Sequence, residues 1–103
     1  MNTKININGK EYNTVYGMAL LEWLGSELET DDIVEIIKHF ESLEDIATLK
    51  LTHIPKLAFL LRGAISAGGG EITKEEAEDW CLPNALTAMR VLNSFSATLP
   101  GRS

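Results

Sequence analysis

The sequence predicts an α+β fold that is mostly α, with an N-terminal β-hairpin followed by five or six short helices in one compact domain over residues 1–103. Two patterns lead to this prediction. Apolar and polar residues alternate on both sides of an Asn-Gly pair near the N-terminus, which is typical of a hairpin. From residue 17 onward, apolar residues recur at helical spacing between capping residues, glycines and prolines. The length of 103 residues fits a single domain.

The hairpin is expected over about residues 3–16. Asn8-Gly9 favours a two-residue type I′ turn, because both central positions of that turn need a positive φ. The resulting register places Ile5 opposite Tyr12. One face then carries Ile5, Ile7, Tyr12 and Tyr16, and the other carries Lys4, Asn6, Glu11 and Asn13. A lone hairpin is marginal, so it must pack on helices or pair an edge with another chain.

Helices are expected over about residues 17–99, before a short tail at 100–103. The first, about 17–28, has an apolar face that Met18 and Trp23 widen. Asp32 and Glu35 have capping-box spacing and open a second helix. Ser42 is expected to cap another helix that reaches about residue 50. The apolar face of the first helix consists of Leu20, Leu21, Leu24 and Leu28. The apolar face of the second helix consists of Ile33, Ile36, Ile37 and Phe40.

Three further helices are expected in the second half of the chain. Pro55 suits the first turn of one, and the glycines at 68–70 end it. Thr73 and Glu76 form a capping box for the next, which ends near Cys81. Pro83 is predicted at the first position of the last helix. The apolar stripes are Leu57, Leu60, Leu61, Ala64 and Ile65, then Ala85, Ala88, Met89, Leu92, Phe95 and Leu99.

The charge balance argues against several classes of partner. Fifteen acidic and nine basic residues give a net charge of −6. Nucleic acids and anionic membranes attract clustered Lys and Arg, so neither is expected as a partner. No apolar run approaches the roughly 20 residues of a membrane span, and no signal region begins the chain. The single cysteine excludes an internal disulfide, which suits the cytoplasm. A neutral or basic protein surface is the expected partner.

The residues that could carry chemistry do not form a recognisable catalytic or metal-binding motif. His39 follows Glu35 by four residues and His53 is near in sequence, but the HExxH spacing is missing. His39 is therefore expected on a solvated helix face, and His53 in the turn before Pro55. Cys81 is expected as a buried core residue rather than a nucleophile. No catalytic site, metal or cofactor is predicted.

The candidate contact residues are aromatic or acidic. Tryptophan is enriched in interfaces, although small cores also use it. The acidic run at 75–79 suits a helix N-terminus, and two of its carboxylates could meet a basic partner. The predicted protein-contact residues are Tyr12, Tyr16, Trp23, Phe59, Glu75, Glu78 and Trp80.

The order of these elements resembles the tail assembly chaperones of long-tailed, siphovirus-like bacteriophages and related prophages. The resemblance rests on "ININGKEY…YGMALLEWL", on "LAFLLRGAISAGGG", on "ITKEEAEDW" and on a closing "LP", and it covers about residues 4–100. Tyr16-Gly17 stands where that family's pattern has Phe-Gly.

The resemblance implies a protein that binds the tape measure protein, keeps it soluble and helps recruit tail tube subunits. Such a chaperone works in the cytoplasm of the bacterial host and is absent from the finished virion. Members of this family also self-associate, and a frameshift-extended form of the same protein is common. The alternative from the residues alone is a small acidic regulatory or adaptor domain. A hydrolase that uses His39, His53 or Cys81 is the more distant alternative.

Overall fold

The computed structural model describes residues 2–40 and 51–98. A two-stranded hairpin precedes the helices, which confirms the predicted mostly helical α+β class. The elements are β1 (Asn2–Ile7), β2 (Lys10–Val15), α1 (Met18–Leu28), α2 (Ile33–His39), a 3₁₀ turn η2 (Leu51–His53), α3 (Ile54–Ala67), α4 (Lys74–Cys81) and α5 (Ala85–Thr98). The helix predicted after Ser42 and the tail at 100–103 lie outside the described residues.

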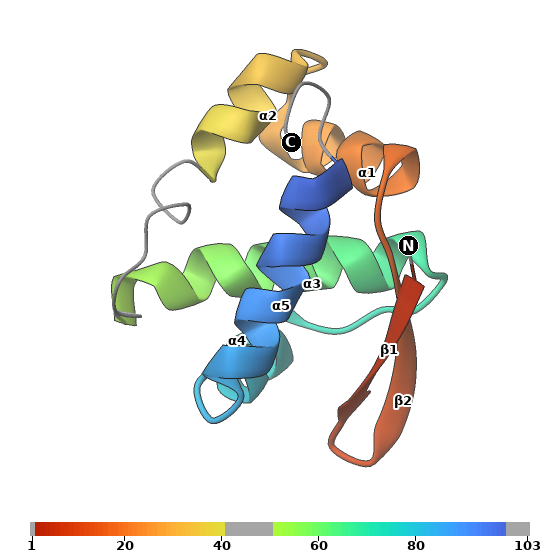
Figure 1. The fold of residues 1–103 in the computed structure, drawn as a ribbon, viewed down its shortest axis with the longest axis vertical. Helices are drawn as coiled ribbons and strands as arrows, with labels where there is room; N and C mark the ends of the chain where they lie inside the picture. The colour runs from red at the N-terminus through yellow and green to blue at the C-terminus, as the bar shows by residue number, and fades with distance from the viewer. Residues whose placement is uncertain (1, 41–50, 99–103) are drawn as a thin grey trace.

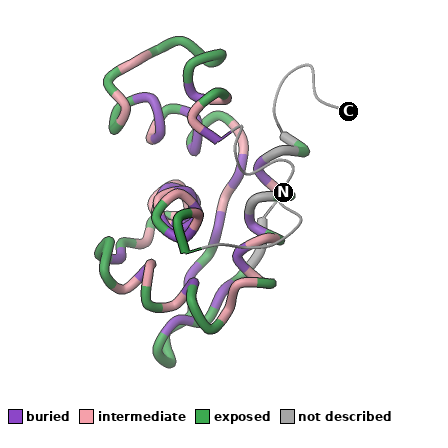
Figure 2. Tube along the Cα trace, turned by 90° about the vertical axis from the view of Figure 1, so that its left-hand side faces the viewer, coloured by how far each residue is buried: buried purple, intermediate pink, exposed green. Residues whose placement is uncertain are grey.

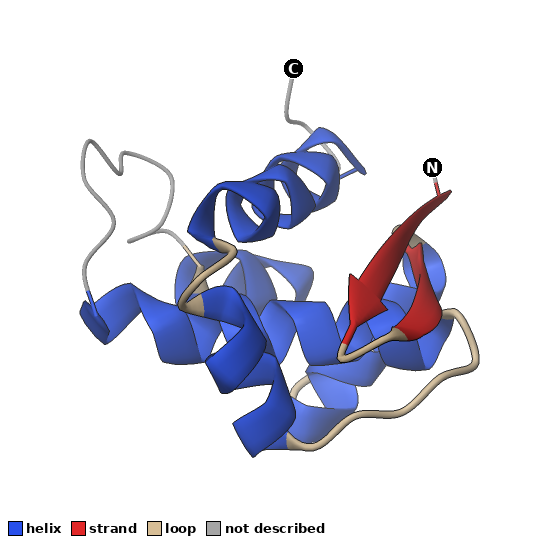
Figure 3. Cartoon of the chain, turned by 90° about the horizontal axis from the view of Figure 1, so that it is seen from below, coloured by secondary structure: helices blue, strands red, loops and turns tan. Residues whose placement is uncertain are grey.

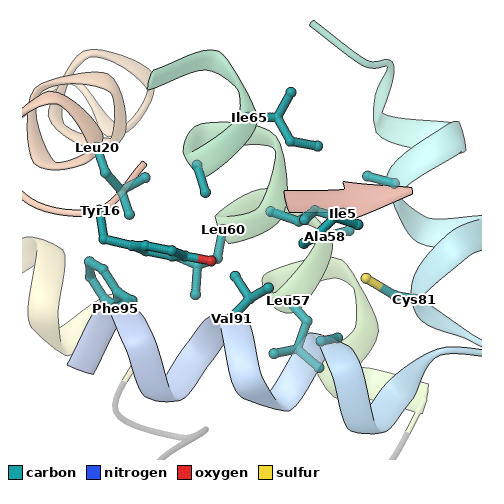
Figure 4. Close-up of a cluster of buried hydrophobic side chains, with 14 of the residues drawn as sticks. Ile5, Tyr16, Leu20, Leu57, Ala58, Leu60, Ile65, Cys81, Val91 and Phe95 are labelled. Carbon is teal, nitrogen blue, oxygen red and sulfur yellow. The ribbon is translucent and has the colours of Figure 1, made fainter. Parts of the chain in front are cut away.

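Helix α3 is the centre of the fold. It runs across the middle of the molecule, and the hairpin lies beside the helical part (Figures 1 and 3). It contacts β2, α1, α4 and α5. Its whole predicted stripe is buried: Leu57, Leu60, Leu61, Ala64 and Ile65. Figure 4 shows Tyr16, Leu20, Val91 and Phe95 meeting this stripe from three other segments, so the hydrophobic core forms around α3.

The hairpin has the predicted geometry. Ile5 pairs with Tyr12 and Ile7 with Lys10, in the expected register. Asn8 has a φ of 54° and Gly9 a φ of 84°, as a turn with two left-handed central residues requires. The Asn6 side chain accepts a hydrogen bond from the Gly9 backbone N–H at 3.0 Å, which supports this turn. The apolar face is buried and the polar face is exposed, as Figure 2 shows along the strands.

Each of the two edges of the hairpin is contacted at one residue by another part of the chain. The indole Nε1–H of Trp80 donates a hydrogen bond of 3.1 Å to the backbone oxygen of Asn6 on β1. On β2, Gly68 lies so close to the backbone oxygen of Asn13 that an added Cβ would collide with it. Residues from α4 and from the end of α3 therefore lie against the two edges of the hairpin.

Local chemistry sets the helix ends. The Asp32 side chain accepts a hydrogen bond from the Val34 N–H at 2.9 Å and caps α2. Thr73 and Glu76 form the predicted capping box of α4. Gly69, with a φ of 91°, follows the end of α3. The N–H of Gly70 then bonds back to the Ile65 oxygen at 2.9 Å, as in a Schellman motif.

Three details of α1 and α5 differ from the sequence predictions. Pro83 was expected to begin the last helix, but α5 begins at Ala85. The Asn84 N–H and side-chain amide both bond to the Trp80 oxygen, so residues 82–84 form a turn that Pro83, without an N–H, can occupy. Val91 is buried although the predicted stripe omits it. Met18 is 67% exposed rather than part of the buried face of α1.

Candidate protein-binding groove between α1 and α2

A groove of about 670 Å³ lies between α1 and α2. Its walls come from one face of α1, from the loop after it and from the start of α2. The lining residues are Met18, Leu21, Glu22, Gly25, Ser26, Glu29, Thr30, Asp31, Ile33 and Ile36. We call this surface the α1–α2 groove. Figure 1 places both helices at the top of the molecule, away from α4.

The connection between the two helices folds tightly back onto α1. Glu29 adopts the left-handed conformation with a φ of 57°, which ends the helix and reverses the chain. The Thr30 N–H then bonds to the Gly25 oxygen at 2.9 Å. A Cβ at Gly25 would meet the Thr30 oxygen at 2.6 Å, so this close return needs glycine at that position. The side chain of Ile36 also packs near Gly25 and closes the floor of the groove.

The groove combines a buried floor with exposed apolar walls. Leu21 and Ile36 are buried, whereas Met18 is 67% and Ile33 is 38% exposed. Surface apolar residues are individually ordinary, but here two of them flank one concavity. Covering them would remove apolar surface from water, at roughly 25 cal/mol per Å². The groove is therefore suited to an apolar ligand side chain.

All charged residues that line the groove are acidic. Glu22, Glu29 and Asp31 are exposed along its margin. No described residue that lines the groove is Lys or Arg. Because like charges across an interface are unfavourable and opposite charges speed association, this margin disfavours acidic ligands and favours basic ones.

Two of the predicted contact residues, Trp23 and Phe59, come together in an aromatic cluster. Their ring centroids are 5.2 Å apart, and the Arg62 guanidinium lies 5.7 Å from the Trp23 ring. Phe59 also meets the ring of His39 at 5.7 Å. Phe40 stacks on Phe59 at 6.2 Å and meets Phe95 at 5.4 Å. Both Trp23 and Phe59 are half-buried, so the cluster joins α1, α2, α3 and α5 and still reaches the surface.

The position of His39 corrects the expectation of a solvated helix face. It is half-buried and lies edge-on to the rings of Phe40 and Phe59. Burial, and secondly the positive charge of Lys56, lower the pKa of His39 below its ordinary value of 6.5. His39 is therefore neutral at pH 7 and acts as an aromatic packing group. His53 lies in the turn η2 before Pro55, as predicted.

The other predicted contact residues do not join this cluster. Trp80 is half-buried on α4 and its indole bonds to β1. Glu75 is exposed in the first turn of α4, and Glu78 is half-buried. Tyr12 and Tyr16 are only 8% and 6% exposed, so their rings offer little surface to a partner in this conformation. A contact role for any of the seven residues stays a prediction.

Cys81 is buried, as expected. Burial, and secondly the carboxylate of Glu78, raise the pKa of its thiol to about 12. The thiol is therefore protonated at neutral pH and is a poor nucleophile.

The sequence predictions missed the α1–α2 groove. Ile33 and Ile36 were assigned only to a helix face, and Gly25, Glu29 and Asp31 were not singled out as contact residues. One signal was present: the acidic segment "ETDD" at 29–32 lies between two apolar helices. This pattern places carboxylates in the connection between two helices that each have an apolar face. Only the fold shows that part of these two faces stays exposed to solvent.

The part of the chain that the structure describes holds neither a candidate metal centre nor a candidate membrane span. No three His, Cys, Asp or Glu side chains in residues 2–40 and 51–98 are grouped so that they could hold a metal ion. Over the same residues, none of the helices has the length and apolar character needed to cross a membrane. Comparisons with protein-family models, curated protein sequences and solved structures find no match to this chain.

Proposed function

We propose that this protein is a tail assembly chaperone of a long-tailed phage or related prophage. In this proposal it binds a helical apolar segment of the tape measure protein, keeps that protein soluble and helps recruit tail tube subunits. The observation that carries the proposal is the α1–α2 groove, with its apolar floor and its exposed Met18 and Ile33. The sequence resemblance and the order of hairpin and helices support it.

A helix laid in the groove would present side chains at i, i+3, i+4 and i+7 to the floor between α1 and α2. A contact confined to two short helices would bury little surface, and such small contacts are typically weak and reversible. Reversibility suits a protein that must release its client before the tail is finished. The protein has a net charge of −6, so complexes with a bound apolar segment would be hydrated at the surface and would repel one another. This repulsion would keep the bound segment in solution.

The proposal has further consequences for location and assembly. The chaperone would act in the cytoplasm of the host and would leave before the virion is complete. Several copies would cover a long tape measure protein, either as a homo-oligomer or together with a frameshift-extended form. The half-buried Trp23–Phe59 pair reaches the surface and is a second apolar contact through which copies could meet.

Co-expression with the tape measure protein encoded in the same genome tests the proposal. The protein should raise the soluble fraction of the tape measure protein. A groove variant, Met18→Gln with Ile33→Gln, should lose most of this effect, because it makes the walls polar without touching the buried core. The matched control is Leu82→Gln with Leu86→Gln, which alters two exposed leucines near the turn between α4 and α5.

Each outcome bears on the proposal. Solubility that is the same with and without the wild-type protein would reject the chaperone function and favour an adaptor domain with another partner. Equal loss in the groove variant and the Leu82/Leu86 control would reject the α1–α2 groove as the binding site.

A further inference from the structure

The charges around the α1–α2 groove point to the chemistry of its ligand. We infer that the groove takes a basic amphipathic helix, in which Lys or Arg residues flank an apolar stripe. This inference deepens the proposed function and rests on the groove described for it. It adds that Glu22, Glu29 and Asp31 select the segment that binds.

The spacing along α1 defines the expected pattern. The residues of α1 and its end that line the groove, at positions 18, 21, 22, 25, 26 and 29, recur every three or four residues and so share one face. Glu22 and Glu29 are seven residues apart, which is two helical turns or about 10 Å. A bound helix that runs along α1 would therefore match them with basic residues at i and i+7. Its apolar residues between these positions would face Leu21 and Ile36.

The end of α1 supplies an independent argument for a basic ligand. A helix C-terminus carries a partial negative charge and favours cations. The last turn of α1 has no basic residue, and the acidic Glu27 and Glu29 lie at this end instead. Asp31 adds a further exposed carboxylate in the loop. Within residues 2–40 and 51–98, no ion pair to these carboxylates is found, so a cation from a ligand would meet unneutralised charge.

Acidic and uncharged ligands fit less well. An acidic helix would bring like charges against three exposed carboxylates in a protein of net charge −6. An uncharged apolar helix would gain the contacts with the floor but would leave the margin without a partner. The preference should therefore lie in the charge of the flanking residues, and it should weaken as salt screens exposed pairs.

Three synthetic helical peptides test this inference. They share one apolar stripe and differ only at two flanking positions seven residues apart, which are Lys, Gln or Glu. Binding is measured by fluorescence anisotropy with the full chain at low and at high salt. We expect the Lys peptide to bind about tenfold more tightly than the Gln peptide, since exposed pairs each contribute modestly. The Glu peptide should bind most weakly.

Two matched variants locate the effect. Glu22→Gln, Glu29→Gln and Asp31→Asn together should abolish the preference for the Lys peptide. Glu11→Gln, Glu71→Gln and Asp79→Asn together change the net charge equally, but none of these three exposed residues lines the groove. This second variant should keep the preference. Circular dichroism melting of both variants checks that they fold as the wild type does.

The outcomes separate the inference from the proposed function. Equal binding of the Lys and Gln peptides to the wild type would overturn the inference, and so would the same loss of preference in both variants. In either case the chaperone proposal would survive if the Met18/Ile33 variant still lost solubilising activity. A charge preference that maps to the three groove carboxylates, without any effect on a tape measure protein, would support the ligand chemistry and reject the chaperone function.

Discussion

The hairpin side and the α1–α2 end of the molecule use apolar residues in opposite ways. At the hairpin, every inward apolar side chain is buried, and both strand edges meet other parts of the chain at Asn6 and Asn13. At the α1–α2 end, Met18 and Ile33 remain exposed beside a groove. The apolar side chains of the hairpin are thus buried by other parts of the same chain, whereas the α1–α2 end leaves apolar surface in contact with water.

This difference separates stability from binding. Surface that is already buried contributes to the folded state and has no more to contribute to a partner. Surface left exposed can be buried by a ligand without first breaking internal contacts. The comparison therefore predicts that substitutions near the hairpin and α3 change stability, while substitutions at the groove change binding.

The largest expected contrast is between Leu60 and Met18. Leu60 is fully buried on α3, so Leu60→Ala should lower the free energy of unfolding by about 2–5 kcal/mol. Met18→Gln should change it by no more than about 0.5 kcal/mol, because the side chain is mostly exposed. Urea denaturation followed by tryptophan fluorescence measures both. Similar losses in the two variants would break the comparison.

The next test concerns the contact between α3 and the hairpin. Gly68→Ala places a Cβ against the backbone oxygen of Asn13. Because this oxygen belongs to the backbone of β2 and not to a flexible side chain, it cannot move aside easily. Overpacking of this kind should cost about 1–3 kcal/mol. The neighbouring Gly69→Ala has open space around it but a φ of 91°, so it should cost about 1–2 kcal/mol from backbone strain alone. Amide hydrogen exchange in β2 should accelerate in the Gly68 variant, and unchanged exchange there would contradict the close contact.

Tyr16→Phe should be a stabilising change. The Tyr16 hydroxyl is buried, has no hydrogen-bond partner among the described residues and lies among apolar side chains (Figure 4). Removing an unsatisfied buried hydroxyl should raise the free energy of unfolding by about 1 kcal/mol. Phenylalanine is also the residue that the family resemblance led us to expect before Gly17. A loss of stability on thermal denaturation would show that this hydroxyl has a favourable partner in solution.

Trp80→Phe tests the tie between α4 and β1. Phenylalanine keeps an aromatic ring but removes the Nε1–H that donates to Asn6. The expected loss is about 1 kcal/mol, the usual net contribution of one hydrogen bond. Hydrogen exchange should show the loss as faster opening of β1, with α1 and α2 unaffected. Equal acceleration in all of these elements would mean that Trp80 acts on the whole core and does not hold the strand edge.

The smallest expected effect is a pH dependence from His39, which connects the end of α2 to α3. Its pKa is lowered in the folded state, so the unfolded state binds the proton more readily. Stability is therefore complete above the ordinary pKa of 6.5 and falls as the pH drops below it towards the lowered folded pKa. His39→Phe should remove this decrease, so that the free energy of unfolding changes little between pH 7 and about pH 5.5. A wild-type curve that is already flat there would contradict the packing role of His39.

Local patterns predicted much of the fold because their causes are local. The Asn8-Gly9 turn sets the hairpin register, and the Thr73–Glu76 box starts α4 within a few residues. Pro83 was placed wrongly because a proline before a helix fits a turn as well as a first helical position, and the hydrogen bonds to Trp80 decided between them. The exposure of Met18 was also missed, because a helix-face pattern does not show whether another element covers it.

The sequence by itself determined the hairpin, its inward face, the stripe of α3 and the acidic balance, since each depends on neighbouring residues or on composition. Only the tertiary structure decided three further points. Trp80 meets β1 across 74 positions of chain, Trp23 and Phe59 come together, and α1 and α2 leave a groove with an acidic margin. These points depend on distances between segments that are remote in sequence. Such distances follow from how all the apolar faces pack at once, which no single pattern specifies.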